Sequence, residues 1–412
     1  MKIAIDLGNK YVKAISEEGK HVMFRSVVAE GKRRQILSLS GRVGNLQDTL
    51  QVGLGDKGPG WKHYYVGHMA ERFGTFPEYV IGPDRFDSKS IEVLIWTAIA
   101  LLDPNAKDIE LVLDFPYSQF NSDNDSLMKS LLNLPMTIDV QTMPSRTFVI
   151  RKISRYPQAL VAAHALAEMY AGEFQQNDGH IAIVDIGGGT TDVVVLERFG
   201  EDYFVHEELS GTLNHGTQDL STAMCREVEQ ETGILLETAQ ADQVVEKGTI
   251  FHAGKTWDFS TSVEQAKKSL AAALKSGMTG LWGSQVNRIR AVFWIGGGAS
   301  VLHNHVRDFH AGNEFPKQSQ WLNAMGCLKA VADTTVEGTP DKSNPEKDTP
   351  VTQNRQESDQ KRNETNQERP TAKSPEHTSV VQRGSATSIG PTEKRTHQVD
   401  VDSRFKEGQG SW

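Results

Sequence analysis

The chain has 412 residues, a formal net charge of −9 at pH 7 and two cysteines, Cys225 and Cys327. That length is enough for two or three domains of roughly 100–200 residues each. The acidic balance gives no support for a nucleic-acid-binding surface, which is usually basic. Two cysteines exclude a disulfide framework and are typical of a reducing cytosol.

Neither the N-terminal segment nor the most apolar stretch of the chain indicates a membrane protein. Asp6 interrupts the first apolar run, so MKIAIDLGNKYVKAIS lacks the apolar core of a secretory signal. The most apolar stretch, IEVLIWTAIALL at 91–102, falls short of the roughly 20 residues that a spanning helix needs, so we expect a buried helix there. We therefore expect a cytoplasmic protein with no membrane partner.

The first part of the chain alternates β-rich runs with helical patterns. KIAIDLG at 2–8 and KYVKAIS at 10–16 predict a hairpin around a Gly-Asn turn. IELVLDFP at 109–116 predicts a buried strand that ends at its proline, and NDSLMKSLLNL at 124–134 has helical spacing. PQALVAAHALAEMYAG at 157–172 predicts a helix that begins at proline and ends at glycine.

The same alternation continues to about residue 332. HIAIVDIGG and TTDVVVLERF, between 180 and 199, predict a second hairpin around glycines. Amphipathic helices are predicted in 219–233 and 262–277, each ended by glycine. IRAVFWIGGG at 289–298 predicts another buried strand, and QWLNAMGCLKAVA at 320–332 predicts the last helix.

The composition changes after residue 332. Residues 333–412 contain no leucine and are rich in Thr, Pro, Glu, Lys, Gln, Asn and Ser. Such a segment does not bury enough apolar surface to offset its chain entropy, so we expect a disordered tail.

Two segments, beginning at residues 3 and 181, share one order of parts: strand, aspartate, glycine turn and return strand. This weak internal repeat predicts two related α/β domains. Ligand sites are frequent at domain interfaces, so we expect a site between them.

The first of these turns has the residues of an anion site. Gly8 lets the backbone turn tightly so that successive N–H groups converge. Lys13 follows on the return strand and supplies a point charge for phosphate. Asp6 offers a hard oxygen for Mg²⁺, which prefers carboxylates and keeps much of its water.

The second turn repeats these parts more densely, with Asp185 before the triple glycine 187–189 and Thr190 after it. Two such turns facing each other would grip a polyphosphate, with Asp6 and Asp185 holding the metal. A tight hairpin without a ligand is the alternative interpretation of this loop. A third run, Gly296–Gly298 with Ala299, follows a buried strand and would let a flat ring approach the backbone.

Other site signatures are weak or missing. GTIFHAGKT at 248–256 ends like a P-loop, but its glycines are one residue too far apart and no strong strand precedes it. GxSxG, HExxH and paired CxxC motifs do not occur, so nucleophile-elbow hydrolases and zinc sites have no support.

Five segments taken together resemble one superfamily. DLGNKYVK, YPQALVAA, DIGGGTTDVVV, WIGGGAS and NAMGCLKA are similar, in this order, to the phosphate 1, connect 1, phosphate 2, adenosine and connect 2 motifs of the actin, heat-shock chaperone and sugar kinase ATPases. The resemblance implies two ribonuclease-H-like, actin-like α/β domains that flank a nucleotide cleft, with ATP and Mg²⁺ bound in the cleft. It also implies that Gln158 positions the attacking water, with a helix-capping role as the alternative.

The resemblance further implies the nucleotide-binding residues. VEQAKKSL is similar to the adenosine-contacting helix of the chaperone branch, although Ala271 stands where that branch has serine, and a solvated helix face remains the alternative for its two lysines. LNHGTQDL is similar to the glycine segment after phosphate 2. The nucleotide-binding residues implied by the five motifs and these two segments are Gly8, Asn9, Lys13, Gly187, Gly188, Gly189, Thr190, Gly216, Glu264, Lys267, Lys268, Gly296, Gly297, Gly298 and Ala299.

The resemblance also predicts the domain boundaries. Domain I is expected at 1–160 with a smaller subdomain at about 20–90, and domain II at 161–332 with a smaller subdomain at about 217–284. The last helix, 320–332, is expected to pack back on domain I.

Within the superfamily, YYVGHMAER and LVLDFPYSQF are similar to segments of the ParM/StbA plasmid-segregation proteins, with LDFP where that family usually has GLP. This resemblance implies a filament-forming ATPase whose partners are further copies of the chain and an adaptor bound to centromere-like plasmid DNA, without direct DNA contact. Filament architecture, the adaptor and the choice between ATP and GTP stay open.

Three other functions are alternatives to the filament. A chaperone-type ATPase needs a β-rich peptide-binding domain that the leucine-free tail does not supply. A small-molecule kinase would use a catalytic aspartate, for which Asp192 is a candidate. A divisome or pilus scaffold would need an amphipathic membrane helix, and the tail has no apolar stripe.

Overall fold

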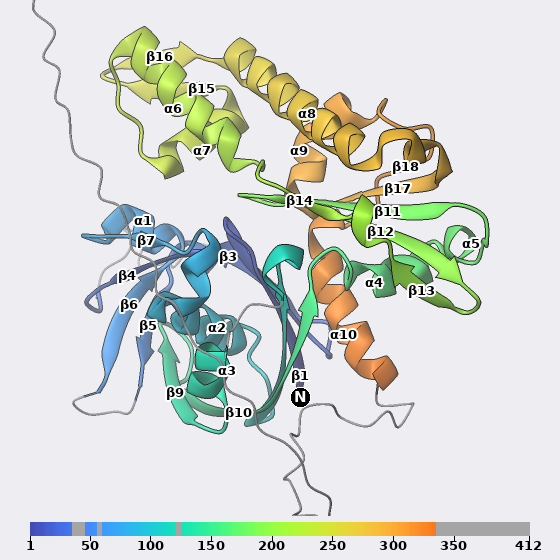
Figure 1. Ribbon diagram of the computed structural model, residues 1–412. Coiled ribbons are helices and arrows are strands. Elements are labelled where there is room, and N and C mark those ends of the chain that lie inside the picture. Colours follow the sequence, from blue (N-terminus) through green and yellow to red (C-terminus); the bar gives the residue numbers. More distant parts are fainter. Residues whose placement is uncertain (35–45, 56–59, 121–124, 335–412) are drawn as a thin grey trace, which may run out of the picture. The chain divides into compact units, whose positions relative to one another are not determined.

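The computed structural model describes residues 1–34, 46–55, 60–120 and 125–334 (Figure 1). The predicted disordered tail lies outside these residues, except for its first two positions, which continue the last helix. No helix among the described residues is both long enough and apolar enough to cross a membrane.

The first sheet contains ten strands within the described residues, in the order β3-β2-β1-β8-β10-β9-β5-β6-β4-β7. Its strands are β1 (Lys2–Leu7), β2 (Tyr11–Ser16), β3 (His21–Arg25), β4 (Val27–Glu30), β5 (Gln51–Leu54), β6 (Lys62–Val66), β7 (Glu78–Tyr79), β8 (Asp108–Phe115), β9 (Pro135–Val140) and β10 (Arg146–Pro157).

Burial explains the character of the central strands. β1 is buried from Ile3 to Leu7, with the apolar residues 3–5 followed by the buried Asp6, whereas β2 alternates buried and half-buried positions. The predicted hairpin is confirmed, because β1 and β2 pair antiparallel, with Asp6 opposite Lys13. β8 lies parallel to β1 on its other side and ends before Pro116, as predicted.

Helices cover this sheet. They are α1 (His68–Phe73), α2 (Lys89–Leu101), α3 (Asp125–Leu131) and α10 (Leu322–Thr334), with a short 3-10 helix, η2 (Pro83–Asp87), before α2. The expected buried helix at 91–102 is α2, which begins at Lys89. It is capped by Ser88, whose hydroxyl accepts a hydrogen bond from the Ser90 N–H. α10 packs on β1, β2 and β8, although it comes last among the described elements (Figure 1).

The second sheet has six strands within the described residues, ordered β13-β12-β11-β17-β18, with β14 also paired to β12. They are β11 (His180–Ile186), β12 (Thr191–Phe199), β13 (Asp202–Val205), β14 (Gly211–Leu213), β17 (Ile289–Ile295) and β18 (Asn313–Glu314). Its helices are α4 (Ala162–Met169), α5 (Ala171–Phe174) and α9 (Gly296–Val306).

The remaining elements between β14 and β17 are helical, with one small hairpin. They are α6 (Gln218–Thr232), α7 (Thr238–Lys247), β15 (Thr249–His252), β16 (Lys255–Asp258) and α8 (Ser260–Trp282). The segment that ends in Gly-Lys-Thr forms the β15–β16 hairpin, without the strand–loop–helix context of a P-loop.

The two sheets repeat one topology. In each, three antiparallel strands form a meander (β1-β2-β3 and β11-β12-β13), and two further strands run parallel to the first (β8 and β10, β17 and β18). The repeat predicted between residues 3 and 181 is therefore present as a repeated strand order. The domain boundaries at 160 and 332 and the subdomain limits stay predictions.

Two expected element ends were wrong, and both involve packing. The helix expected from 157 begins at Ala162, because β10 continues to Pro157 and Ala159 has a positive φ of 61°. α8 does not end at Gly277 but runs on to Trp282. A Cβ at Gly277 would lie 2.9 Å from the Leu213 side chain, so this glycine makes room for β14 rather than ending the helix.

Candidate functional site

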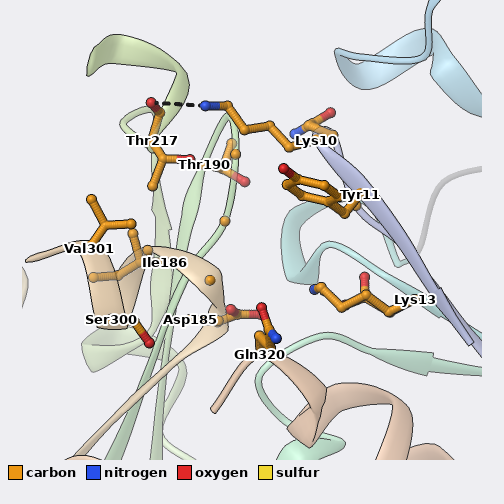
Figure 2. Close-up of a pocket in the computed structure, with 18 of the residues that line it drawn as sticks. Lys10, Tyr11, Lys13, Asp185, Ile186, Thr190, Thr217, Ser300, Val301 and Gln320 are labelled. Carbon is orange, nitrogen blue, oxygen red and sulfur yellow. Dashed lines mark hydrogen bonds and ion pairs between the residues drawn. The ribbon is translucent and has the colours of Figure 1, made fainter. Parts of the chain in front are cut away.

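A cavity of about 570 Å³ lies where the ends of β1, β11 and β17 meet (Figure 2). Figure 2 shows Lys10, Tyr11 and Lys13 on one side of it and Asp185, Ile186 and Thr190 on the other. Residues of α6, α7, α8, α9 and the start of α10 also line it, together with Arg25 of β3, Arg85 of η2, and Pro116 and Gln158. The cavity is therefore built by segments from both sheets.

The two predicted phosphate turns contact each other. A Cβ at Gly188 would lie 3.0 Å from Lys10 Cγ, and one at Gly189 would lie 2.7 Å from Asn9 Nδ2. A Cβ at Gly188 would also lie 3.2 Å from the Lys10 backbone nitrogen, so glycine there favours the close approach of the loop after β11 to the loop after β1. The predicted arrangement, with the two turns facing each other, is what the structure has.

Gly216 lies behind the second turn rather than on the cavity surface. Its Cα faces the backbone carbonyls of Gly187 and Gly188, with no room for a side chain. Next to it, the Thr217 N–H donates to Gly187 O (3.1 Å) and the Gln218 N–H to Gly188 O (2.8 Å). These bonds anchor the beginning of α6 to the loop that carries the triple glycine.

Asp6 and Asp185 are buried at the base of the cavity, with 2% and 7% of their surface exposed. Lys13 Nζ contacts Asp6 Oδ2 at 2.6 Å, and Asn323 Nδ2 of α10 donates to Asp185 Oδ2 at 2.6 Å. Burial and the charge of Asp6 raise the pKa of Asp185 to about 6. The two carboxylates therefore repel each other across a site that Lys13 only partly neutralises.

A third carboxylate, Asp114, lies beneath this pair. It stands opposite Asp6 in the register of β1 and β8 and is fully buried. Burial and the charge of Asp6 raise its pKa well above the usual value for aspartate. Asp114 stands in LDFP, the segment that departs from the GLP of the family that the sequence resembles.

Gln158 links these carboxylates to the cavity. Its Nε2 donates to Asp114 Oδ1 (2.8 Å) and to Asp6 Oδ1 (3.2 Å), while its backbone N–H donates to Phe115 O (2.7 Å). With both amide hydrogens directed at carboxylates, only Oε1 is left to accept a hydrogen bond. Gln158 does not cap α4, whose N-cap is Val161.

The third glycine run forms the beginning of α9, a helix that the sequence did not predict. Gly296 has a positive φ of 81°, and a Cβ there would overlap the Asp185 carboxylate and the Ile186 carbonyl. A Cβ at Gly298 would overlap the Ile186 side chain. A Cβ at Gly297 would meet nothing within 4 Å. Two of these glycines thus allow α9 to pack against β11, and Gly297 alone leaves open space facing the cavity.

Of the three adenosine-binding residues predicted on α8, only Lys267 lines the cavity. Lys267 lines the cavity and pairs with Glu264 (2.7 Å), which also contacts His305 of α9 (3.2 Å). Lys268 is exposed and does not line the cavity. Ala299 is buried beneath Ser300 and Val301, which do line it.

Sequence reasoning missed an ion-pair cluster on the cavity wall. Asp242 of α7 accepts from Lys10 Nζ (2.8 Å) and from Arg25 Nη2 (2.5 Å), and Arg25 also pairs with Glu71 of α1 (3.0 Å). Lys10 Nζ further donates to Thr217 O (3.3 Å), the bond drawn in Figure 2. No local pattern marks these residues, because they come from distant segments.

The cluster is electrostatically strong. Burial acts to raise the pKa of Asp242, but Lys10 and Arg25 outweigh it, so this pKa is lowered. Burial lowers the pKa of Lys10. Within the described residues, no group of three or more His, Cys, Asp and Glu side chains has the arrangement of a metal cluster.

Two family models match the chain, and together they include most of the described residues. The model of the N-terminal domain of actin-like proteins matches residues 4–160. The model of the C-terminal part of the archaeal actin homologue, MreB-like, matches residues 183–308. No protein with a curated description matched the chain.

Solved actin-like proteins have the same fold. A 15-stranded ParM filament from Clostridium botulinum is 27% identical with a TM-score of 0.74, over 81% of this chain and 99% of that one. A non-polymerisable ParM quadruple mutant is 26% identical with a TM-score of 0.72, over the same shares. An archaeal actin homologue in complex with ADP, 21% identical with a TM-score of 0.66 and again the same shares, matches in fold.

Proposed function

Because the chain belongs to the actin-like proteins of the ParM type, we propose that it binds and hydrolyses ATP and assembles into filaments. We further propose that these filaments segregate plasmid DNA through an adaptor, in the cytoplasm.

The observation that carries the proposal is the contact between the two glycine turns. Gly188 and Gly189 lie directly against Asn9 and Lys10, and the cavity beside them is lined by residues from both sheets. Turns of this kind direct backbone N–H groups at an anion. A volume of about 570 Å³ is within the usual range for small-molecule pockets, and this supports a nucleotide as the ligand.

The carboxylates at the base of the cavity fit a magnesium ion. Asp6 and Asp185 supply hard oxygens. Burial and, second to it, the charge of Asp6 raise the pKa of Asp185, and a divalent cation would relieve the repulsion between the two carboxylates. Mg²⁺ held there would neutralise negative charge on the phosphates of ATP. Lys13, whose ammonium contacts Asp6, would contribute a further positive charge.

Gln158 is proposed to orient the attacking water. Its amide NH₂ is held by Asp114 and Asp6, so Oε1 is the group that accepts a hydrogen from water at the cavity. A neutral amide positions water without removing its proton. Asp114 is fully buried and therefore acts on Gln158, not on the substrate.

Assembly is proposed from the similarity to a ParM filament. Head-to-tail contacts between identical subunits produce open filaments when the rotation between subunits does not close into a ring. The net charge of −9 supports contact with DNA through an adaptor rather than directly.

Light scattering and sedimentation of the purified chain test this function. With ATP and Mg²⁺ we expect scattering to rise and the chain to sediment, and with ADP or without nucleotide we expect neither. Gln158→Ala should slow phosphate release by about 10²-fold and leave ATP-dependent assembly intact.

The alternatives make different predictions in the same assay. If the chain hydrolyses ATP without forming a polymer, a chaperone-like ATPase is favoured. If a sugar is phosphorylated and no polymer forms, the chain is a small-molecule kinase with Asp192, which lines the cavity, as the candidate base.

A further inference from the structure

Arg85 is a buried cation on the cavity wall that the proposed function does not use. It lies in η2, between β7 and α2, and only 5% of its surface is exposed. It nevertheless lines the cavity together with Asp6, Pro116 and Gln158.

The charge of Arg85 has no anionic partner in the part of the chain that the structure describes. Nη1 donates to the carbonyl oxygen of Gly82 (3.0 Å), and Nε is buried without a hydrogen-bond partner. The guanidinium lies 4.5 Å from the ring centre of Phe86. Buried charges in proteins are normally paired, because leaving one unpaired is costly.

Two contacts of neighbouring residues hold the segment around Arg85 beside the cavity. On one side, the Gly82 N–H donates to Asn9 Oδ1 in the first turn (3.2 Å). On the other, the ring of Phe86 packs against Phe115 at the end of β8, 4.6 Å between centres. η2 is therefore held beside Asp6 and Gln158, while Lys267 lies among the residues of α8 and α9.

The guanidinium remains charged at neutral pH. Burial lowers the pKa of Arg85 to about 10, and the carboxylates of Asp6, Asp114 and Asp192 oppose this shift. None of these carboxylates lies within ion-pair distance of Arg85 among the contacts of the described residues. They hold the charge in place without satisfying its hydrogen bonds.

We propose that Arg85 binds the terminal phosphate of ATP. This inference rests on the proposed ATP binding. A guanidinium presents a planar fork of donors that matches phosphate oxygens. When the water oxygen bonds to the terminal phosphorus, the bond from phosphorus to the bridging oxygen breaks and its electron pair leaves with that oxygen on ADP. One proton of the water stays on the released phosphate and the other passes to solvent, while Arg85 remains bound to that phosphate.

Nucleotide affinity tests this role without relying on turnover. Dissociation constants are measured by calorimetry, with Mg²⁺, for ADP and for an ATP analogue with an imido β–γ bridge. Arg85→Gln should weaken binding of the analogue about 10- to 100-fold, the loss expected for hydrogen bonds to a charged group. ADP binding should change less than about twofold, because ADP lacks the terminal phosphate.

Two further variants keep the result interpretable. Arg85→Lys keeps the charge but not the planar fork of donors, so its affinity for the analogue alone should fall about three- to tenfold. This variant provides the test if Arg85→Gln does not fold. Arg151→Gln removes an exposed arginine that pairs with Asp108, and both affinities should stay unchanged.

The outcomes separate this inference from the function beneath it. Suppose that wild type binds the analogue. If both Arg85 variants then lose affinity equally for the two nucleotides, or keep the wild-type affinity for both, the role of Arg85 is overturned and ATP binding stands. If wild type binds neither nucleotide, the proposed function fails and this inference fails with it.

Discussion

Asp192 occupies, in the second sheet, the place that Lys13 occupies in the first. Each lies on the return strand directly opposite the aspartate before the turn: Lys13 opposite Asp6, and Asp192 opposite Asp185. The first turn thus holds an ion pair and the second holds two carboxylates. Burial raises the pKa of Asp192 to about 7, although a hydrogen bond from Thr212 (2.6 Å) opposes the shift.

The raised pKa of Asp192 predicts a pH-dependent gain from Asp192→Asn. The folded chain keeps this proton up to about pH 7, whereas the unfolded chain loses it near pH 4, so ionisation costs stability as the pH rises between these values. Asparagine never ionises and still accepts from Thr212. The unfolding free energy of the variant should exceed that of wild type by up to about 4 kcal/mol above pH 7, and by much less at pH 5.

Urea denaturation at pH 5, 6, 7 and 8 without nucleotide measures this difference. Asp178→Asn, at an exposed carboxylate, is the control and should show no trend with pH. A difference for Asp192→Asn that is constant over the whole range would contradict the prediction.

At the residue scale, the sequence predicts which site residues lie close together within one hairpin, and it predicts little about contacts between distant segments. Asp6, Gly8 and Lys13 lie within one hairpin, so their proximity follows from local pairing. Arg85 and Asp114 reach the cavity only through the packing of segments that are far apart. The departure LDFP was the one available signal for Asp114, and its register opposite Asp6 appears only in the sheet.

At the scale of the elements, some helix glycines are required by a close packing contact and others are not. Gly326 of α10 lies against the backbone of Val161 and Ala162, where a Cβ would overlap main-chain atoms that have no room to move. Gly280 of α8 has nothing within 4 Å of its Cβ position. Gly326 lies inside α10 and Gly280 lies in the last turn of α8, and at both positions alanine has the higher intrinsic helix propensity.

Gly326→Ala should destabilise the fold and Gly280→Ala should stabilise it. For Gly326, overpacking against main chain costs about 1–3 kcal/mol or more, which outweighs a propensity gain of about 1 kcal/mol. For Gly280 only that gain remains. Thermal unfolding of both variants and wild type measures the difference, and an increase in the melting temperature for Gly326→Ala would refute this account of the α4–α10 contact.

Element types were largely predictable, and element ends were not. The two hairpins, α2, α6 and α10 follow from local pattern, and α6 ends at Gly233 in the left-handed conformation as expected. α9 was missed because three glycines disfavour a helix, and only its packing on Ile186 shows why they are tolerated. The predicted end of α8 was too early because Gly277 resembles the glycine that often follows a helix.

At the scale of the whole molecule, the cluster around Asp242 joins elements of the first sheet to α7. Lys10 and Arg25 come from the β1–β2 loop and β3, and all three side chains line the cavity. The side chains of Arg25 and Asp242 are 5% and 17% exposed, so solvent screens their attraction less than that of a surface pair. We expect nucleotide exchange to require these contacts to separate.

Asp242→Asn should therefore accelerate nucleotide release. Loss of about 1 kcal/mol of this attraction corresponds to roughly a fivefold faster rate. Release of a fluorescent ADP analogue, chased with excess unlabelled ADP, measures it. Asp308→Asn removes an exposed ion pair with Lys275 and should leave the rate unchanged. An unchanged rate in Asp242→Asn would show that the cluster does not limit release.

α10 has a consequence for how the chain is made. The last described helix covers the first strand: Ala4 of β1 and Val112 of β8 are buried under Ala324, Cys327 and Val331. During synthesis β1 leaves the ribosome first, but its face stays open to water until residues 322–334 have followed. A nascent chain that lacks α10 would expose this apolar face. Until α10 has been made, the first sheet would depend on chaperones to keep its exposed face from associating with other chains.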